Sequence, residues 1–192
     1  KEGFVVVSNS TALSNSSSYS YSFDSESDLG GVSDWHLNEQ INNGNQWGFN
    51  TEANSINWKW ETGLAPDKSS YSCIKVPAEN MLAGESTEII SKAYNLSGFT
   101  SPAIKFSWSG AATNTDPQNT LSVTYSDDCG KSWKSLGVLD EYQTSNAGLY
   151  STDFTPNADE WDDIIMTKDQ LKDPNIRFKF EYNAAAAANN FY

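Results

Sequence analysis

The segment from Leu121 to Trp133 constrains the fold of this chain more than any other part of it. Leu121, Val123 and Tyr125 alternate with small polar residues, which is the period of a β-strand with one buried face. The following Ser126-Asp-Asp-Cys-Gly130 predicts a tight turn, because Asp side chains bond to nearby backbone amides and glycine accepts positive φ. Trp133 then begins a returning strand. The segment therefore predicts an antiparallel hairpin, and it contains no nucleophile–base pair and no metal-ligand spacing.

Similar short runs recur along the chain between clusters of Gly, Asn, Asp and Pro, and helical periodicity is almost absent. One helical turn is expected over 167–171, with Thr167 as its cap and Pro174 blocking its extension. Strands without intervening helices predict an all-β antiparallel β-sandwich. The expected strands are 19–24, 56–61, 71–77, 86–93, 103–109, 120–126, 133–139, 149–154, 160–166 and 175–183.

The length of 192 residues suits one sandwich domain, expected over 19–192. Residues 1–18 are expected to form an N-terminal strand or a linker from a preceding region: Phe4-Val-Val-Val7 suits an edge strand, and the Ser/Asn-rich remainder suits a linker. No signal peptide is visible, so we expect Lys1 to begin a mature or excised fragment. The five alanines 184–188 fit neither a sandwich turn nor an amphipathic helix, and we assign them no function.

Composition and charge narrow the classes of partner. The 7 Trp, 9 Tyr and 9 Phe among many Ser and Asn residues are typical of an extracellular β protein. The net charge of −13 argues against nucleic acid and against anionic membrane surfaces, because both require clustered cations. No run approaches the roughly 20 apolar residues that span a bilayer, so direct membrane insertion is not expected.

The order of several short motifs resembles a known family. The carriers are Tyr21-Ser-Phe-Asp24, Trp35, Trp47, the segment Thr87–Ser97, Ile104-Lys-Phe-Ser-Trp108, the Ser-Asp-Asp-Cys-Gly-x-x-Trp turn at 126–133, Phe154-Thr-Pro156, Trp161, Ile176-Arg-Phe-Lys-Phe180 and Asn189-Asn-Phe-Tyr192. Together they resemble a jelly-roll module of secreted and surface proteins of Bacteroidetes, similar to cleaved-adhesin, choice-of-anchor, MAM-like and galactose-binding-like domains. The chain departs from that pattern in two ways: Lys92-Ala93 replaces a Ser-Pro pair, and the Asp-bearing segment after the closing strand is absent.

The resemblance implies a jelly-roll fold and a place beside the catalytic domain of a metallopeptidase of the pregnancy-associated plasma protein-A (cytophagalysin) type. The chain would then be a non-catalytic accessory or binding module, secreted or at the bacterial cell surface. Its partner would be the catalytic domain of the same polypeptide, or a protein or glycan at the cell surface. Two alternatives stay open: a free-standing adhesin or carbohydrate-binding module, and a jelly-roll enzyme acting on glycans.

Catalytic residues are scarce in the sequence. A zinc peptidase of that type needs a His-Glu-x-x-His helix, whereas His36 is the single histidine of the chain. Adjacent residues on a strand point to opposite faces, so acidic doublets are poor glycosidase pairs, and we interpret them as solvated charges of turns and strand edges. The doublets are Asp127-Asp128, Asp140-Glu141, Asp159-Glu160 and Asp162-Asp163.

A structural calcium ion is the one cofactor we consider. Asp24, Glu26 and Asp28 supply carboxylates at alternate positions, and Ca²⁺ prefers such oxygen ligands. In jelly rolls resembling this chain, a cation often joins the opening strand to the closing one. The alternative is an ordinary acidic turn without EF-hand spacing.

Tryptophans and cysteines complete the candidates. Trp58 and Trp60 fall on one face of an expected strand, where they either stack on sugar rings or fill the core. Trp133 and Trp161 are expected in the core, because the resemblance places them at structural positions. Cys73 and Cys129 are the only cysteines, and a secreted context favours a disulfide between them; the alternative is two separate thiols.

Overall fold

The computed structural model describes residues 72–192, except 116 and 186–187, together with the backbone of four earlier strands. Strands and three short 3-10 helices make up all the regular structure of this part of the chain. The early strands are β1 (Val5–Asn9), β2 (Tyr19–Tyr21), β3 (Trp35–Asn38) and β4 (Lys59–Thr62). The remaining elements are β5 (Ser72–Lys75), η2 (Ala78–Asn80), β6 (Ser86–Ser91), β7 (Pro102–Trp108), β8 (Gly110–Ala112), β9 (Thr120–Ser126), β10 (Lys134–Leu139), η3 (Gln143–Ser145), β11 (Asp162–Thr167), η4 (Asp169–Leu171), β12 (Arg177–Asn183) and β13 (Ala188–Phe191).

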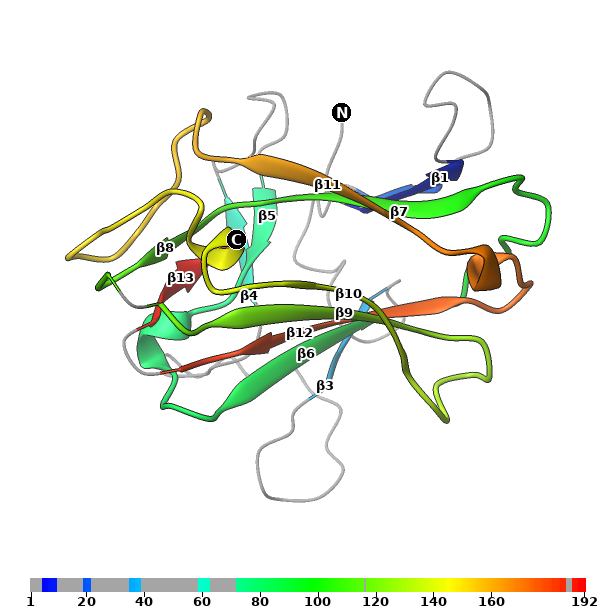
Figure 1. Cartoon of the computed structure of the whole chain (residues 1–192), viewed down its shortest axis with the longest axis horizontal. Coiled ribbons are helices and arrows are strands. Elements are labelled where there is room, and N and C mark those ends of the chain that lie inside the picture. Colours follow the sequence, from blue (N-terminus) through cyan, green and yellow to red (C-terminus); the bar gives the residue numbers. More distant parts are fainter. Residues whose placement is uncertain are drawn as a thin grey trace.

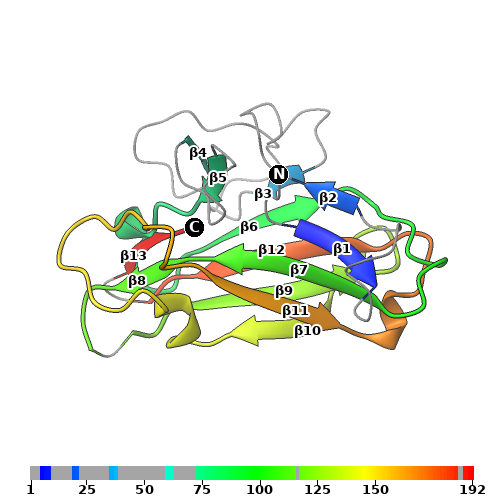
Figure 2. The same cartoon turned by 90° about the horizontal axis from the view of Figure 1, so that it is seen from above.

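Two antiparallel sheets form the body of the molecule. The larger has the order β10-β9-β12-β6-β3 and the smaller β11-β7-β1-β2. Figure 1 shows them edge-on as two layers, and Figure 2 shows the smaller sheet lying over the larger one. The pairs β4–β5 and β8–β13 form two further small sheets at one end. The expected all-β antiparallel architecture is confirmed.

The core lies between the two layers and follows the alternation of the strands. Phe178, Phe180 and Tyr182 of β12 are buried on its inner face, while Lys179 and Glu181 fall on the outer face. Phe106 of β7 meets Phe180 edge-on, with ring centroids 5.0 Å apart. Burial of such large side chains contributes roughly 25 cal/mol per Å² of apolar surface, so these facing strands hold the layers together.

The strand predicted over 149–154 is wrong. This segment is a loop that touches β8 through one bridge, between Leu149 and Ala112. The buried Asn189 amide satisfies its backbone instead, donating to the carbonyl oxygens of Tyr150 (3.3 Å) and Thr152 (2.8 Å). The Asn189 Oδ1 accepts from the Phe154 amide at 2.9 Å. A side chain replaces the ladder that the sequence pattern suggested.

Two smaller expectations also need correction. The Val-rich run forms β1, but β1 pairs with both β7 and β2 and is therefore not an edge strand. The helical turn exists as η4, yet Thr167 does not cap it, because its Oγ1 donates to the Pro102 carbonyl at 3.0 Å. The Ser/Asn-rich run 10–18 lies outside the described residues. Within the described part of the chain, no helix is long and apolar enough to span a membrane.

Candidate functional site

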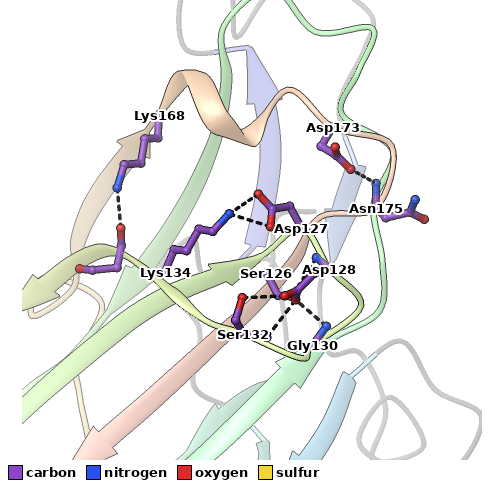
Figure 3. A network of polar contacts seen from close by, with 10 residues as sticks. Ser126, Asp127, Asp128, Gly130, Ser132, Lys134, Lys168, Asp173 and Asn175 are labelled. Carbon is purple, nitrogen blue, oxygen red and sulfur yellow. Dashed lines mark hydrogen bonds and ion pairs between the residues drawn. The ribbon is translucent and has the colours of Figure 1, made fainter.

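The turn between β9 and β10 is held by one carboxylate. Asp128 accepts from the Ser132 amide (2.9 Å), the Ser132 hydroxyl (2.6 Å) and the Ser126 hydroxyl (2.7 Å). The Ser126 Oγ in turn accepts from the Gly130 amide at 2.8 Å. Figure 3 shows these groups converging inside the turn. Cys129 and Gly130 take positive φ values of 64° and 85°, and these bonds fix that conformation.

These bonds determine the chemistry of Asp128. The hydroxyl and the amide of Ser132, with the hydroxyl of Ser126, hold the pKa of this carboxyl well below its ordinary value. Because the ionised form is stabilised so strongly, Asp128 is a poor proton donor near neutral pH. Its role in this geometry is to fix the turn.

A second set of contacts joins the turn to the core and to β11. The Lys134 ammonium lies 2.8 and 2.6 Å from the two carboxylate oxygens of Asp127, whose hydrogen bond raises the pKa of Lys134. Lys134 and Lys168 place their Nζ atoms 5.9 and 5.6 Å from the centre of the Tyr125 ring. Lys168 also donates to the Ser135 carbonyl at 2.8 Å, which ties the end of β11 to β10 (Figure 3).

Beside the turn, the outer face of the larger sheet carries a charged group that is largely removed from water. Lys179 Nζ lies 2.7 Å from a carboxylate oxygen of Glu88 and 3.2 Å from one of Glu181. The Lys179 side chain is 11% exposed and that of Glu88 3%. The same ammonium lies 5.3 Å from the centre of the Trp133 ring. We call Trp133, Thr124, Lys179, Glu88 and Glu181 the outer-face cluster.

The electrostatics of this cluster fix the charge of its lysine. Burial acts to lower the pKa of Lys179, but the hydrogen bond and the charge of Glu88, with the charge of Glu181, outweigh burial and raise it. Lys179 is therefore a held cation and not a free base. Burying an ion pair to this extent costs desolvation energy. Replacing the charged residues with apolar residues of similar volume is therefore often neutral for the stability of a protein.

Thr124 is the neutral polar member of the cluster. It is the ladder partner of Lys179 in the β9–β12 pair, and it is half-buried. Its hydroxyl oxygen is buried and has no hydrogen-bond partner among the described residues. The cluster thus combines an aromatic ring, a fixed cation, two carboxylates and a hydroxyl with unused hydrogen-bonding capacity.

The other acidic doublets are also used by the fold. Asp140 accepts from the amides of the turn that follows it, at 3.1 and 2.9 Å. Glu160 accepts from the Asn157 amide at 2.7 Å and from the Tyr150 hydroxyl, and these bonds lower its pKa. Asp163 pairs with Lys105 at 2.9 Å. In each of the four doublets at least one carboxylate holds its own loop or strand in place.

Several predicted site residues fall outside what the structure describes. Asp24, Glu26 and Asp28, proposed for calcium, and Trp58 lie outside the described residues. Trp60 lies on β4 opposite Ile74 in the ladder, where only the backbone is described. His36 lies on β3 opposite Ile90. The calcium site and the sugar-stacking tryptophan pair therefore stay predictions.

The expectation that Trp133 fills the core is wrong, since it is half-buried and belongs to neither core cluster, whereas Trp161 is half-buried at the edge of one. Trp161 packs against a small satellite cluster at the end of the sandwich. Trp133 precedes Lys134 and lies against Lys179, on the outer face of the larger sheet. The alternation Arg-Phe-Lys-Phe-Glu-Tyr of β12 is the sequence signal that places Lys179 and Glu181 on that face, and our sequence reasoning missed it.

The predicted disulfide is not formed. Cys73 is buried on β5 and Cys129 is exposed in the β9–β10 turn, and no bond joins them. The expectation assumed neighbouring core strands, but β5 pairs with β4 and belongs to a different sheet from β9. Figure 1 shows β5 and the β9–β10 turn at opposite ends of the sandwich, whereas a disulfide needs Cα atoms within roughly 7 Å of each other.

Among the residues that the structure describes, no three His, Cys, Asp or Glu side chains lie close enough together to hold a metal ion. Comparison with known proteins adds no relative: no family model matches the chain, and no curated protein matches its sequence. Any assignment of function therefore rests on the chemistry of the residues and on the order of the sequence motifs.

Proposed function

We propose that this chain is a non-catalytic binding module of a secreted or surface-attached bacterial multidomain protein. The observation that carries the proposal is that carboxylates of the described residues bind other groups of the fold. Asp127, Asp128, Asp140, Glu160 and Asp163 each hold a turn, a loop or a cation of the fold. A general acid or base needs a carboxylate whose proton is available near the working pH, and Asp128 and Glu160 have lowered pKa values.

We propose further that the sandwich is of the jelly-roll type. From β6 to β12 the chain changes sheet between β6 and β7, between β7 and β9, between β10 and β11, and between β11 and β12. Jelly rolls consist of two packed sheets built from Greek keys, which require such crossings. The resemblance of the ordered motifs to the Bacteroidetes jelly-roll modules supports the same assignment.

The parent protein we propose is a zinc metallopeptidase of the pregnancy-associated plasma protein-A type, in which this module lies outside the catalytic domain. The support is the motif order alone, so the decisive experiment concerns the whole polypeptide. We expect its gene to encode a His-Glu-x-x-His motif in the same reading frame. Deleting the module should leave cleavage of a short peptide unchanged and slow cleavage of a large folded or surface-bound substrate.

The isolated chain provides the complementary test. We expect the purified chain to cleave neither peptides nor oligosaccharides. Chelator-sensitive cleavage by the chain alone, abolished by one substitution such as Glu88→Gln, would make it an enzyme and contradict the proposal. A parent without a peptidase motif would instead favour the second candidate, a free-standing carbohydrate-binding module, which the outer-face cluster supports by joining an aromatic ring to fixed polar groups.

A further inference from the structure

We infer that the outer face of β9 and β12, beside Trp133, binds a neutral sugar chain. This inference rests on the proposed binding function and names the ligand class of the outer-face cluster. It depends on the composition of the face, its accessibility and its charge.

The outer face of β9 is a row of hydroxyl groups. Thr120, Ser122 and Thr124 alternate with the buried Leu121, Val123 and Tyr125, so they share the outer face. The ladder places Asn183, Glu181 and Lys179 of β12 directly beside them. A central strand of small hydroxyl residues, flanked by longer polar side chains, offers donors and acceptors along its whole length.

The face is open on the side of β10 and closed on the side of β6. Ser135 and Val138 of β10 are exposed, and Ser122, Thr124 and Trp133 are half-buried. Glu88 on β6, in contrast, is nearly inaccessible. A ligand would therefore lie along β9, with Trp133 at one end and the Lys179 and Glu181 side chains along its edge.

The polar groups of the face are fixed before any ligand arrives. Lys179 is held between Glu88 and Glu181, and its ammonium lies against the Trp133 ring. Fixed side chains lose little conformational entropy on binding, which favours affinity.

Charge decides the class of ligand. One ammonium between two carboxylates gives the cluster a net charge of −1 by count, and the chain as a whole carries −13. An anionic ligand would be repelled. Each hydroxyl of a neutral sugar both donates and accepts, so it can pair with a lysine and a carboxylate together, while the apolar side of its ring stacks on an indole. The charge of the face thus disfavours an anionic sugar, and its polar groups and indole ring suit a neutral sugar chain.

The experiment measures binding of the full chain to hexasaccharides of glucose, mannose, xylose and galactose by isothermal titration calorimetry, with polygalacturonate as the anionic probe. We expect at least one neutral hexasaccharide to bind and polygalacturonate not to bind. Trp133→Ala should weaken that binding by about tenfold, the upper end of a lost aromatic contact. Trp133→Phe should retain most of the affinity because it keeps a ring.

Trp161→Ala is the matched control, because Trp161 is also half-buried but packs against the satellite cluster away from this face. It should leave the affinity within about twofold of wild type if stacking at Trp133 is the relevant contact. Sugar binding that survives Trp133→Ala, or binding of polygalacturonate alone, would refute this site and leave the binding function standing. Absence of binding to every hexasaccharide would refute the ligand class and leave the proposal of a non-catalytic module, which the cleavage assays test separately. Near-ultraviolet circular dichroism verifies that each variant is folded.

Discussion

At Gly110 the backbone of β8 passes so close to its neighbours that no side chain fits. A Cβ atom there would lie 2.1 Å from the Thr144 carbonyl oxygen and 2.8 Å from a ring carbon of Phe191. One of these contacts is with backbone, which cannot rotate away. We expect Gly110→Ala to lower the free energy of unfolding by about 3 kcal/mol, the upper part of the range for overpacking, measured by urea denaturation.

Gly→Ala substitutions at two other glycines provide a comparison for the loss of stability expected at Gly110. A Cβ at Gly98 would meet nothing within 4 Å, so Gly98→Ala should change the unfolding free energy by less than about 0.5 kcal/mol. A Cβ at Gly137 would meet the Sδ and Cε atoms of Met166 at 2.9 Å. Because these atoms end a flexible side chain, Gly137→Ala should cost about 1 kcal/mol and less than Gly110→Ala. Equal costs at all three positions would contradict this account of β8.

For single residues, the sequence predicted the local hydrogen bonding of a side chain better than the face of the sheet on which the side chain lies. The turn-forming residues from Ser126 to Gly130 were predicted because their side chains bond within four residues. The sequence prediction placed Trp133 in the core, but Trp133 lies on the outer face of the larger sheet. That position depends on where β10 begins and on the contact with Lys179, which is more than 40 residues away in the sequence. The calcium ligands at 24–28 stay predictions.

At the scale of elements, the β9–β10 turn depends on the ionised state of Asp128. The folded-state pKa of Asp128 lies below its unfolded value of about 3.9, so its contribution to stability is complete above that value. The contribution is lost as the pH falls from about 4 toward the folded-state pKa. We expect Asp128→Asn to lower the urea midpoint at pH 7 and the difference from wild type to shrink below about pH 4.

Asp162→Asn is the control for that experiment, because Asp162 is an exposed carboxylate on the edge strand β11. It should leave the midpoint unchanged at pH 7. A difference between Asp128→Asn and wild type that is constant from pH 7 to pH 3 would mean that the turn is held by the shape of the side chain and not by its charge.

Elements with strong alternation and clear turns were predictable, and short ones were not. β9 was predicted at its observed bounds because three large residues alternate with small polar ones. β8 has three residues, Gly110, Ala111 and Ala112, which carry no period, and it exists because β13 pairs with it. The segment 149–154 has strand-like residues, but it pairs with β8 only through the Leu149–Ala112 bridge, and the Asn189 side chain bonds to the carbonyl groups of Tyr150 and Thr152. Tertiary contacts of this kind override local pattern.

At the scale of the whole molecule, packing holds the two layers together without a covalent bond between the cysteines. The layers are joined at the centre by the contact of Phe106 with Phe180. At the edge they are joined by Met166, which packs over Gly137. The aromatic-rich composition predicted such a core, but the sequence could not specify which strands are neighbours. The wrong cysteine pair follows from that limit, because β5 and β9 were placed side by side.

Reduction should therefore leave the stability of the molecule unchanged. A disulfide between Cys73 and Cys129 would close the loop between these two residues and contribute roughly 3–4 kcal/mol to stability in the chain-entropy model. Its loss would lower the melting temperature by several degrees. We expect the same melting temperature with and without dithiothreitol. Before unfolding, Cys129 should react with a thiol reagent because it is exposed, and Cys73 should react only after urea unfolds its buried strand. The contrary result is a protein, purified under oxidising conditions, that yields no thiol after unfolding and melts at a lower temperature when reduced. That result would show that the disulfide forms and that β5 lies nearer to the β9–β10 turn than the sheet order places it.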